Sequence, residues 1–413
     1  MSQQGPIVAV SNRDGRALTG AVAQVKAFPL VEVLWPDAVD AVARLHPAAI
    51  LVSDVKDNAT ALANLAERTA YAEPYLPLIA LDPGTALPQN AIPFTQAGRS
   101  PERLVSRLNA ALRVRALHAT LLRRLSNNRT AAPMPATDPI EDATVLLLGR
   151  GASYPALSVA LGEQTGVIGA LSIEAAAKHL NARELDGIIV GEGFTLRVLD
   201  AFLTVLSEDS RFRNLPVVVA SPPGPAADYD LPNLEVVGGD PRMITAHAIP
   251  LIRQQALEAR IGRALKSIDV GGLLDPRTGL LTNAAFTRDF DTAVAETQAR
   301  GAGLSVARIT FAHGQTSERM RLDAARIISR LMRRMDFATL DDTGAIVVVF
   351  AEADLRNAHA IGRRLGSVLK HTMYSDKREQ RLDLQVALAT LMPGDTSSAI
   401  MARLYTEAHR AAS

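Results

Sequence analysis

Short apolar runs alternate with helical patterns along the first third of the chain. The apolar runs occupy residues 6–12, 48–54 and 77–84, and amphipathic segments lie between them. Runs of this length that alternate with helical segments are typical of the buried strands of a parallel sheet. Residues 100–125 then form one long amphipathic pattern that starts with Ser-Pro, which predicts a long helix.

The same order of elements returns in the middle of the chain. Apolar runs at 143–151, 185–193 and 215–224 repeat the three strands at similar spacing, and 240–265 predicts a second long closing helix. Such self-similarity indicates two copies of one domain. We therefore predict an α/β protein with two doubly wound parallel-sheet domains at 1–129 and 142–268, a Pro-rich linker at 130–141, and a third α/β domain at 272–413.

Composition restricts the class of protein further. The 413 residues fit two to four domains, and no apolar stretch is long enough to span a bilayer. Cysteine is absent, and residues 1–15 do not have the pattern of a secretory signal. The 44 basic residues nearly balance the 43 acidic ones. We expect a cytoplasmic protein without membrane insertion and without broad electrostatic binding to DNA.

The two repeated segments resemble response-regulator receiver domains, which have the flavodoxin-like fold. That family accepts phosphate on an aspartate after its third strand, and Asp54 stands at this position. Ser11 and Asn12 replace the acidic pair that holds Mg²⁺, and Asp82 replaces the hydroxyl residue. Because phosphoryl transfer depends on charge neutralisation by metal and cation, Asp54 is either a possible phosphoacceptor or an ordinary carboxylate at a strand end.

The second copy has lost even the acceptor. Gly149 and Arg150 stand in place of the acidic pair, and Gly191 stands at the acceptor position, followed by Glu192. We expect this domain to be chemically silent. Because the helical faces of receivers commonly pair two-fold, the resemblance implies a homodimer.

The last segment resembles GGDEF domains, which make cyclic di-GMP from two GTP molecules. Its opening, LLDPRTGLLTNAAF, keeps Asp275, Thr278, Gly279 and Leu280 of the family pattern. The order receiver, receiver, GGDEF is that of PleD-type diguanylate cyclases, so the resemblance covers nearly the whole chain.

The residues that would perform this chemistry are missing. Thr310 and Ala312 stand where the family places metal-binding carboxylates, and 313–317 replace most of the loop that holds guanine and ribose. The signature hairpin reads Asp-Thr-Gly-Ala-Ile at 342–346 in place of Gly-Gly-Asp-Glu-Phe. Asp341 and Asp342 are either displaced metal ligands or part of a plain turn, and the turn is favoured. We predict no catalytic residue, no metal and no cofactor.

A ligand site of the family is retained upstream of the hairpin. The RxxD motif that binds cyclic di-GMP at an inhibitory site stands as Arg333, Arg334, Met335 and Asp336, on a helix predicted over 318–336, and Arg364 falls at the place of the second arginine. Guanidinium groups engage phosphate or the guanine O6 and N7 edge, and a carboxylate accepts from guanine N1 and N2. The alternative is a solvated basic helix face.

These observations predict a non-catalytic cyclic di-GMP effector. The resemblance implies that it recruits adaptor or regulatory proteins in cell-cycle or proteolysis control, with a cell pole as one destination. The alternatives are a scaffold or phospho-receiver protein that needs no nucleotide and, third, a residual diguanylate cyclase.

Overall fold

The computed structural model forms two compact units. It describes residues 5–12, 29–95, 101–127, 134, 137–220, 229–300, 303–311, 317–333, 335–351, 353–371 and 384–412. The first unit comprises Met1–Asn127, Thr137–Lys178 and Leu185–Gly262, and the second comprises Asn128–Ala136, His179–Glu184 and Arg263–Ser413.

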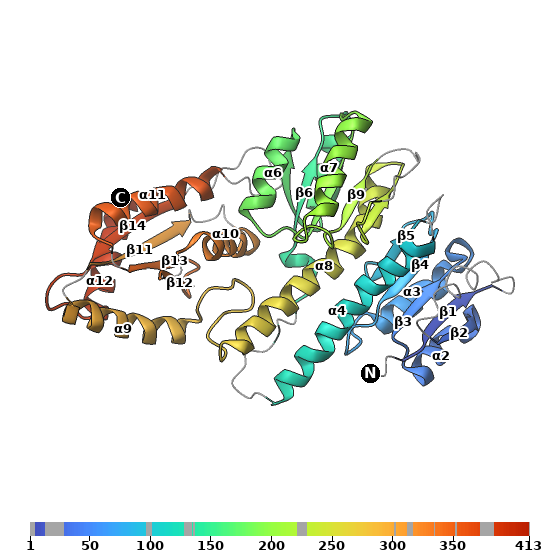
Figure 1. Cartoon of the computed structure of the whole chain (residues 1–413), viewed down its shortest axis with the longest axis horizontal. Helices are drawn as coiled ribbons and strands as arrows, with labels where there is room; N and C mark the ends of the chain where they lie inside the picture. Colours follow the sequence, from blue (N-terminus) through green and yellow to red (C-terminus); the bar gives the residue numbers. More distant parts are fainter. Residues whose placement is uncertain are drawn as a thin grey trace. The chain divides into compact units, whose positions relative to one another are not determined.

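The first unit contains two parallel five-stranded sheets (Figure 1). Sheet A has the strand order β2-β1-β3-β4-β5. Its strands are β1 (Ile7–Ser11), β2 (Leu30–Leu34), β3 (Ala49–Val52), β4 (Leu78–Leu81) and β5 (Ala91–Phe94), and its helices are α2 (Ala38–Leu45), α3 (Ala59–Thr69), α4 (Pro101–Asn127) and the short 3₁₀ helices η1 (Trp35–Asp37) and η2 (Val55–Asn58). This order is that of doubly wound flavodoxin-like sheets, so the predicted α/β class with a parallel sheet is confirmed.

Helices cover both faces of sheet A because successive side chains of a strand point to opposite sides. Val8 and Ile50 pack with residues of α2 and α3. Ile7 and Leu51 pack instead with Leu108 of α4. All four strand residues are fully buried, as strands of a parallel sheet require.

Sheet B repeats this arrangement. Its order is β10-β9-β8-β6-β7. When the strands are counted from β6 and the sheet is followed from its other edge, this is the order of sheet A. Its strands are β6 (Thr144–Leu148), β7 (Gly166–Ala170), β8 (Gly187–Val190), β9 (Val217–Val219) and β10 (Leu234–Val236), and its helices are α5 (Tyr154–Gly162), α6 (Ile173–Ala182), α7 (Leu196–Glu208), α8 (Pro241–Asp269) and the 3₁₀ helix η3 (Pro139–Asp142).

A single hydrophobic core joins the two sheets of the first unit. Leu108 and Leu112 of α4 belong to the same buried cluster as Ile249 and Ile252 of α8. The two long closing helices, α4 and α8, therefore pack within one core of the first unit.

The buried side chain of Arg107 forms several polar contacts within this core. Arg107 donates from Nε to the carbonyl of Pro232 over 2.6 Å and from Nη2 to that of Leu234 over 2.8 Å. Its Nη2 also lies 3.2 Å from the Glu235 carboxylate, and both side chains are fully buried. The other oxygen of Glu235 accepts from the backbone amide of Thr95. Residues on β5, α4 and β10 are thus fixed to each other by charge-assisted bonds.

The second unit is built on the antiparallel sheet C, which has the strand order β12-β13-β11-β14. Its strands are β11 (Leu304–Phe311), β12 (Phe337–Leu340), β13 (Ile346–Ala351) and β14 (Leu384–Thr390), and its helices are α9 (Asn283–Arg300), α10 (Glu318–Leu331), α11 (Leu355–His371) and α12 (Ser397–Ala412). Helices α10 and α11 cover one face of this sheet, and α9 and α12 cover the other.

Candidate functional site

The hairpin between β12 and β13 is closed by its own side chains. One carboxylate oxygen of Asp341 accepts from the amides of Thr343 and Ala345, each over 2.9 Å. The other oxygen lies 3.4 Å from the guanidinium of Arg308 on β11. Gly344 N donates to the Asp341 carbonyl over 2.9 Å, which completes the turn. The interpretation of this stretch as a turn is confirmed, and Asp341 acts as its cap.

Asp342, the other acid of the hairpin, is also hydrogen-bonded. Its Oδ1 accepts from Asn283 Nδ2 over 2.8 Å, and Asn283 Oδ1 accepts from the hydroxyl of Thr339 over 2.8 Å. The side chain of Arg321 on α10 lies over Gly344, where a Cβ would come within 2.9 Å of Arg321 Cδ. The roles of Asn283, Arg308 and Arg321 were not predicted, because no local pattern distinguishes a turn-binding side chain from an ordinary surface residue.

The neighbouring strand provides no further acid. Thr310 lies on β11, and Ala312 lies outside the described residues. Within the part of the chain that the structure describes, no group of three or more His, Asp or Glu side chains could hold a metal ion.

The RxxD segment lies at the end of α10. This helix ends at Leu331 and Met332 is extended, with φ −65° and ψ 148°, so the prediction that the helix continues through Asp336 is wrong. Arg333 and Asp336 lie instead on a turn in which Asp336 N donates to the Arg333 carbonyl over 3.1 Å. The strand β12 starts directly afterwards, which leaves no room for another helical turn. Arg334 lies outside the described residues.

The two described motif residues differ in exposure. Arg333 is exposed, whereas Asp336 is buried and its Oδ1 accepts from the amide of Ala351 over 3.2 Å. Burial raises the pKa of the Asp336 carboxyl above its ordinary value, and the Ala351 amide and the charge of Arg333 counter this shift only in part. A desolvated acid with an adjacent guanidinium is a feature of binding sites as well as of structural ion pairs.

Arg364 is exposed on α11, which covers the same face of sheet C as α10. The structure therefore places Arg333 and Asp336 on one turn, and Arg364 lies on a helix that covers the same face of sheet C as α10. Among the described residues, the side chains of Arg333 and Arg364 donate no hydrogen bond, and the charge of Arg333 acts on Asp336.

Asp54 is exposed at the edge of sheet A where the strands end. Its Oδ2 accepts from the amide of Asn12 and from the hydroxyl of Ser53, each over 3.0 Å. Its backbone is left-handed, with φ 56°, and its carbonyl accepts from the side chain of Asn58. Asp54 thus lies beside the end of β1, as its predicted position requires. Whether it accepts phosphate stays a prediction.

At the equivalent edge of sheet B, the strand register matches Gly191 to Ser53 and Glu192 to Asp54, so the prediction that Gly191 stands at the acceptor position is wrong and a glutamate stands there. Gly149 and Gly191 lie at the ends of β6 and β8, and the guanidinium of Arg150 stacks over the ring of Phe194 at 5.1 Å. The amide of Arg150 donates to the carbonyl of Glu192.

No protein-family model and no curated protein matches the chain. Among solved structures, the chain is similar to the GGDEF domain of DgcB from Caulobacter crescentus in complex with c-di-GMP, with 18% identity, 33% of this chain and 88% of that one covered, and a TM-score of 0.30. It is similar to the FimX GGDEF domain from Pseudomonas aeruginosa, with 18% identity, 34% and 93% covered, and a TM-score of 0.31.

A third structure is the diguanylate cyclase SiaD in complex with its activator SiaC from Pseudomonas aeruginosa, with 14% identity, 37% and 64% covered, and a TM-score of 0.31. Structural neighbours over about a third of the chain are thus GGDEF domains. At these identities and TM-scores, the matches carry no information on what this chain binds. No helix among the described residues combines the length and the apolar character that a bilayer crossing needs.

Proposed function

We propose that the protein is a cyclic di-GMP effector that binds the dinucleotide through Arg333, Asp336 and Arg364 and has no cyclase activity. The observation that carries the proposal is a contrast within the second unit. Asp341 and Asp342 accept hydrogen bonds from Arg308 of β11 and Asn283 of α9, whereas Arg333 and Arg364 are exposed and donate no side-chain hydrogen bond among the described residues. Exposed guanidinium groups are free to form bidentate bonds with phosphate or guanine.

The hairpin supports the absence of catalysis. Two-metal chemistry on nucleotides needs carboxylates that are free to coordinate the ions. Asp341 accepts from two backbone amides and faces Arg308, and Asp342 accepts from Asn283. A metal ion that recruited Asp341 would compete with the backbone amides of the turn.

The dinucleotide would act as a signal and not as a substrate. In this proposal, ligand occupancy is transmitted to adaptor or regulatory proteins, and the chain acts as a homodimer. A nucleotide-independent scaffold is the second candidate, and the shared core of the two sheets in the first unit favours it, because that unit contains extensive packing without evident chemistry.

Isothermal calorimetry with cyclic di-GMP on the full chain tests the proposal. We expect saturable binding with a Kd that is roughly micromolar or tighter, lost in Arg333→Ala with unchanged circular dichroism. Pyrophosphate release from GTP with Mg²⁺ should stay at the level of a protein-free control. No heat with the unmodified protein would favour the scaffold, and release of pyrophosphate would favour the cyclase.

A further inference from the structure

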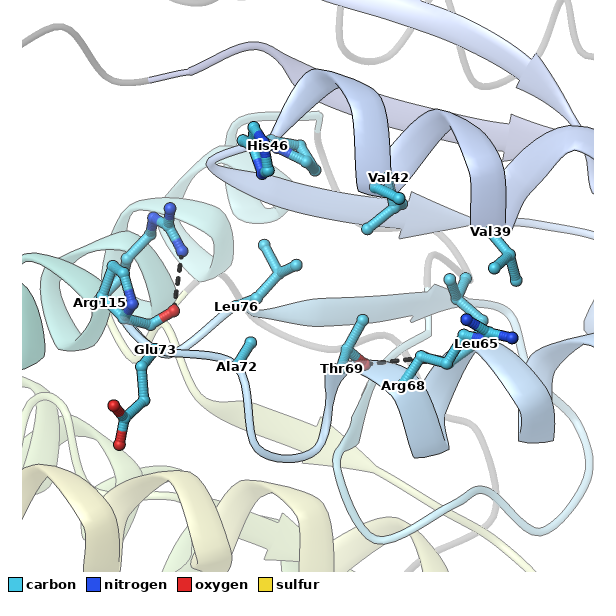
Figure 2. A pocket seen from close by; sticks show the side chains of 13 residues that line it. Val39, Val42, His46, Leu65, Arg68, Thr69, Ala72, Glu73, Leu76 and Arg115 are labelled. Carbon is cyan, nitrogen blue, oxygen red and sulfur yellow. Dashed lines mark hydrogen bonds between the residues drawn. The ribbon is translucent and has the colours of Figure 1, made fainter.

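Sheet A carries a pocket of about 550 Å³ that the sequence analysis did not predict (Figure 2). Its apolar wall comes from α2 and α3 and from the segment before β4, and it includes Val39, Val42, Leu65, Ala72 and Leu76. Arg115 of α4 closes one end. A volume of this size lies within the range of about 300–1,000 Å³ found for small-molecule sites.

The pocket lies at the edge of sheet A where the strands begin. His46 and Pro47, which line it, precede β3, and Pro74 and Leu76, which also line it, precede β4. Asp54 follows the end of β3, so the length of the strand separates it from the pocket. The pocket is therefore a different site from the candidate phosphoacceptor, and it belongs to a different unit from Arg333.

Arg115 is a half-buried cation with neutral partners. Its Nη1 donates to the carbonyls of Pro74 and Tyr75, over 3.1 Å and 2.9 Å. Among the described residues it forms no ion pair. Burial lowers the pKa of its guanidinium, but an arginine stays charged at any physiological pH. A positive charge that is partly removed from water and has no counter-ion favours an anionic ligand.

The other charged residues of the pocket point to the same class of ligand. Arg68 lines it together with Arg115, whereas Glu73 is its single acid. Figure 2 shows that the carboxylate of Glu73 points away from the guanidinium of Arg115. The acid of the pocket therefore does not neutralise Arg115, and the pocket combines an apolar wall with an excess of positive charge.

We propose that this pocket binds a small carboxylate with an aliphatic tail, with the carboxylate on Arg115 and the tail against Val42, Ala72 and Leu76. The planar guanidinium offers its remaining N–H groups in a geometry that matches a carboxylate. The site is independent of cyclic di-GMP binding, because none of its residues belongs to the second unit.

Calorimetry of octanoate and of 1-octanol with the full chain tests this site. We expect octanoate to bind saturably at one site per chain and at least about tenfold more tightly than octanol, since only the carboxylate can pair with a guanidinium. Arg115→Gln should weaken octanoate binding by at least about tenfold and leave octanol unchanged. Arg44→Gln is the matched control on α2, because Arg44 is exposed and does not line the pocket, and it should bind octanoate like the unmodified protein.

Ala72→Phe provides a second test that does not involve Arg115, because the larger side chain fills the pocket and should abolish binding of both probes. If Arg115→Gln fails to fold, the proposal is tested by the Ala72→Phe variant and by the preference of the unmodified protein for octanoate over octanol. The proposal is overturned if octanoate gives no saturable heat, if octanol binds as tightly, or if a folded Ala72→Phe variant binds octanoate as before.

Discussion

The side chain of Arg321 lies directly over Gly344 at the hairpin turn of the second unit. A Cβ at Gly344 would come within 2.9 Å of Arg321 Cδ and 3.0 Å of its Nε, and the backbone of Gly344 has φ +79°. Here an arginine of the chain itself lies at the turn, so we attribute a structural role to the hairpin.

This arrangement predicts that restoring the signature does not restore synthesis. The change combines Asp342→Gly, Thr343→Gly, Gly344→Asp, Ala345→Glu and Ile346→Phe. The change puts an aspartate at position 344, where the backbone is left-handed, and a glutamate at position 345, where the side chain of Ala345 is only 3% exposed. It adds no acid at Thr310. Chromatography of a reaction with GTP and Mg²⁺ should show no cyclic di-GMP. Product formation by this variant would contradict a purely structural role for the hairpin.

The buried pair of the first unit should contribute strongly to its stability. Arg107→Ala leaves the Glu235 carboxylate in the core without its guanidinium, which should lower the free energy of unfolding by about 3–5 kcal/mol. Arg113→Ala is the matched control on the same helix, because its pair with Glu258 is partly exposed and should contribute about 1 kcal/mol or less. Urea unfolding followed by circular dichroism measures both. Equal effects of the two substitutions would contradict a buried role for Arg107.

Asp336 should make stability depend on pH. Because burial raises its pKa in the folded protein, the group stabilises the fold below its unfolded pKa, near about 4, and this contribution is lost as pH rises through the folded pKa. Asp336→Asn keeps an oxygen that can accept from Ala351 N and removes the charge. The stability of this variant relative to the unmodified protein should therefore increase from about pH 4 to neutral pH.

The same variant separates stability from binding. At neutral pH we expect Asp336→Asn to unfold at an equal or higher temperature and to bind cyclic di-GMP at least about tenfold more weakly, since an amide is a weaker acceptor for guanine N1 and N2 than a carboxylate. Thermal unfolding and calorimetry on one preparation measure both quantities. A less stable variant with unchanged affinity would show that Asp336 is only a structural residue.

Asp54 should not accumulate phosphate. Its carboxylate is held by the Asn12 amide and the Ser53 hydroxyl, and Ser11 and Asn12 supply no acid for a magnesium ion. Incubation with acetyl phosphate and Mg²⁺, followed by mass spectrometry of the intact chain, should give no mass increase. A phosphorylated species that disappears in Asp54→Asn would instead support the phospho-receiver alternative.

The sequence predicted those parts of the fold that depend on local periodicity. The long closing helices appear as α4 and α8, and the apolar runs appear as strands of sheets A and B. Strands β2, β5, β7 and β10 were not predicted. LVEVL and LEV are short and carry acids that resemble solvent-facing positions. The Arg107–Glu235 pair was not predicted either, since it joins residues more than a hundred positions apart in the sequence.

For the candidate sites as well, the sequence predicted local features and missed those that depend on tertiary packing. The turn at the hairpin follows from its Asp and Gly residues, whereas its contacts with Arg308 and Arg321 depend on tertiary packing. The pocket beside Arg115 has no sequence signature, because its wall is assembled from separate segments of ordinary apolar residues. The end of α10 was misplaced since Arg333 and Asp336 fit helical spacing as well as they fit the observed turn.

Calorimetry of cyclic di-GMP with Arg364→Ala and Arg363→Ala tests the central claim most directly. These arginines are neighbours on α11 and both are exposed, so nonspecific attraction of a phosphate ligand would be weakened similarly by either change. We predict that Arg364→Ala reduces the affinity by at least about tenfold, or about 1.4 kcal/mol, and that Arg363→Ala changes it by less than about twofold. Absence of binding to the unmodified protein, or equal losses in both variants, would contradict the account.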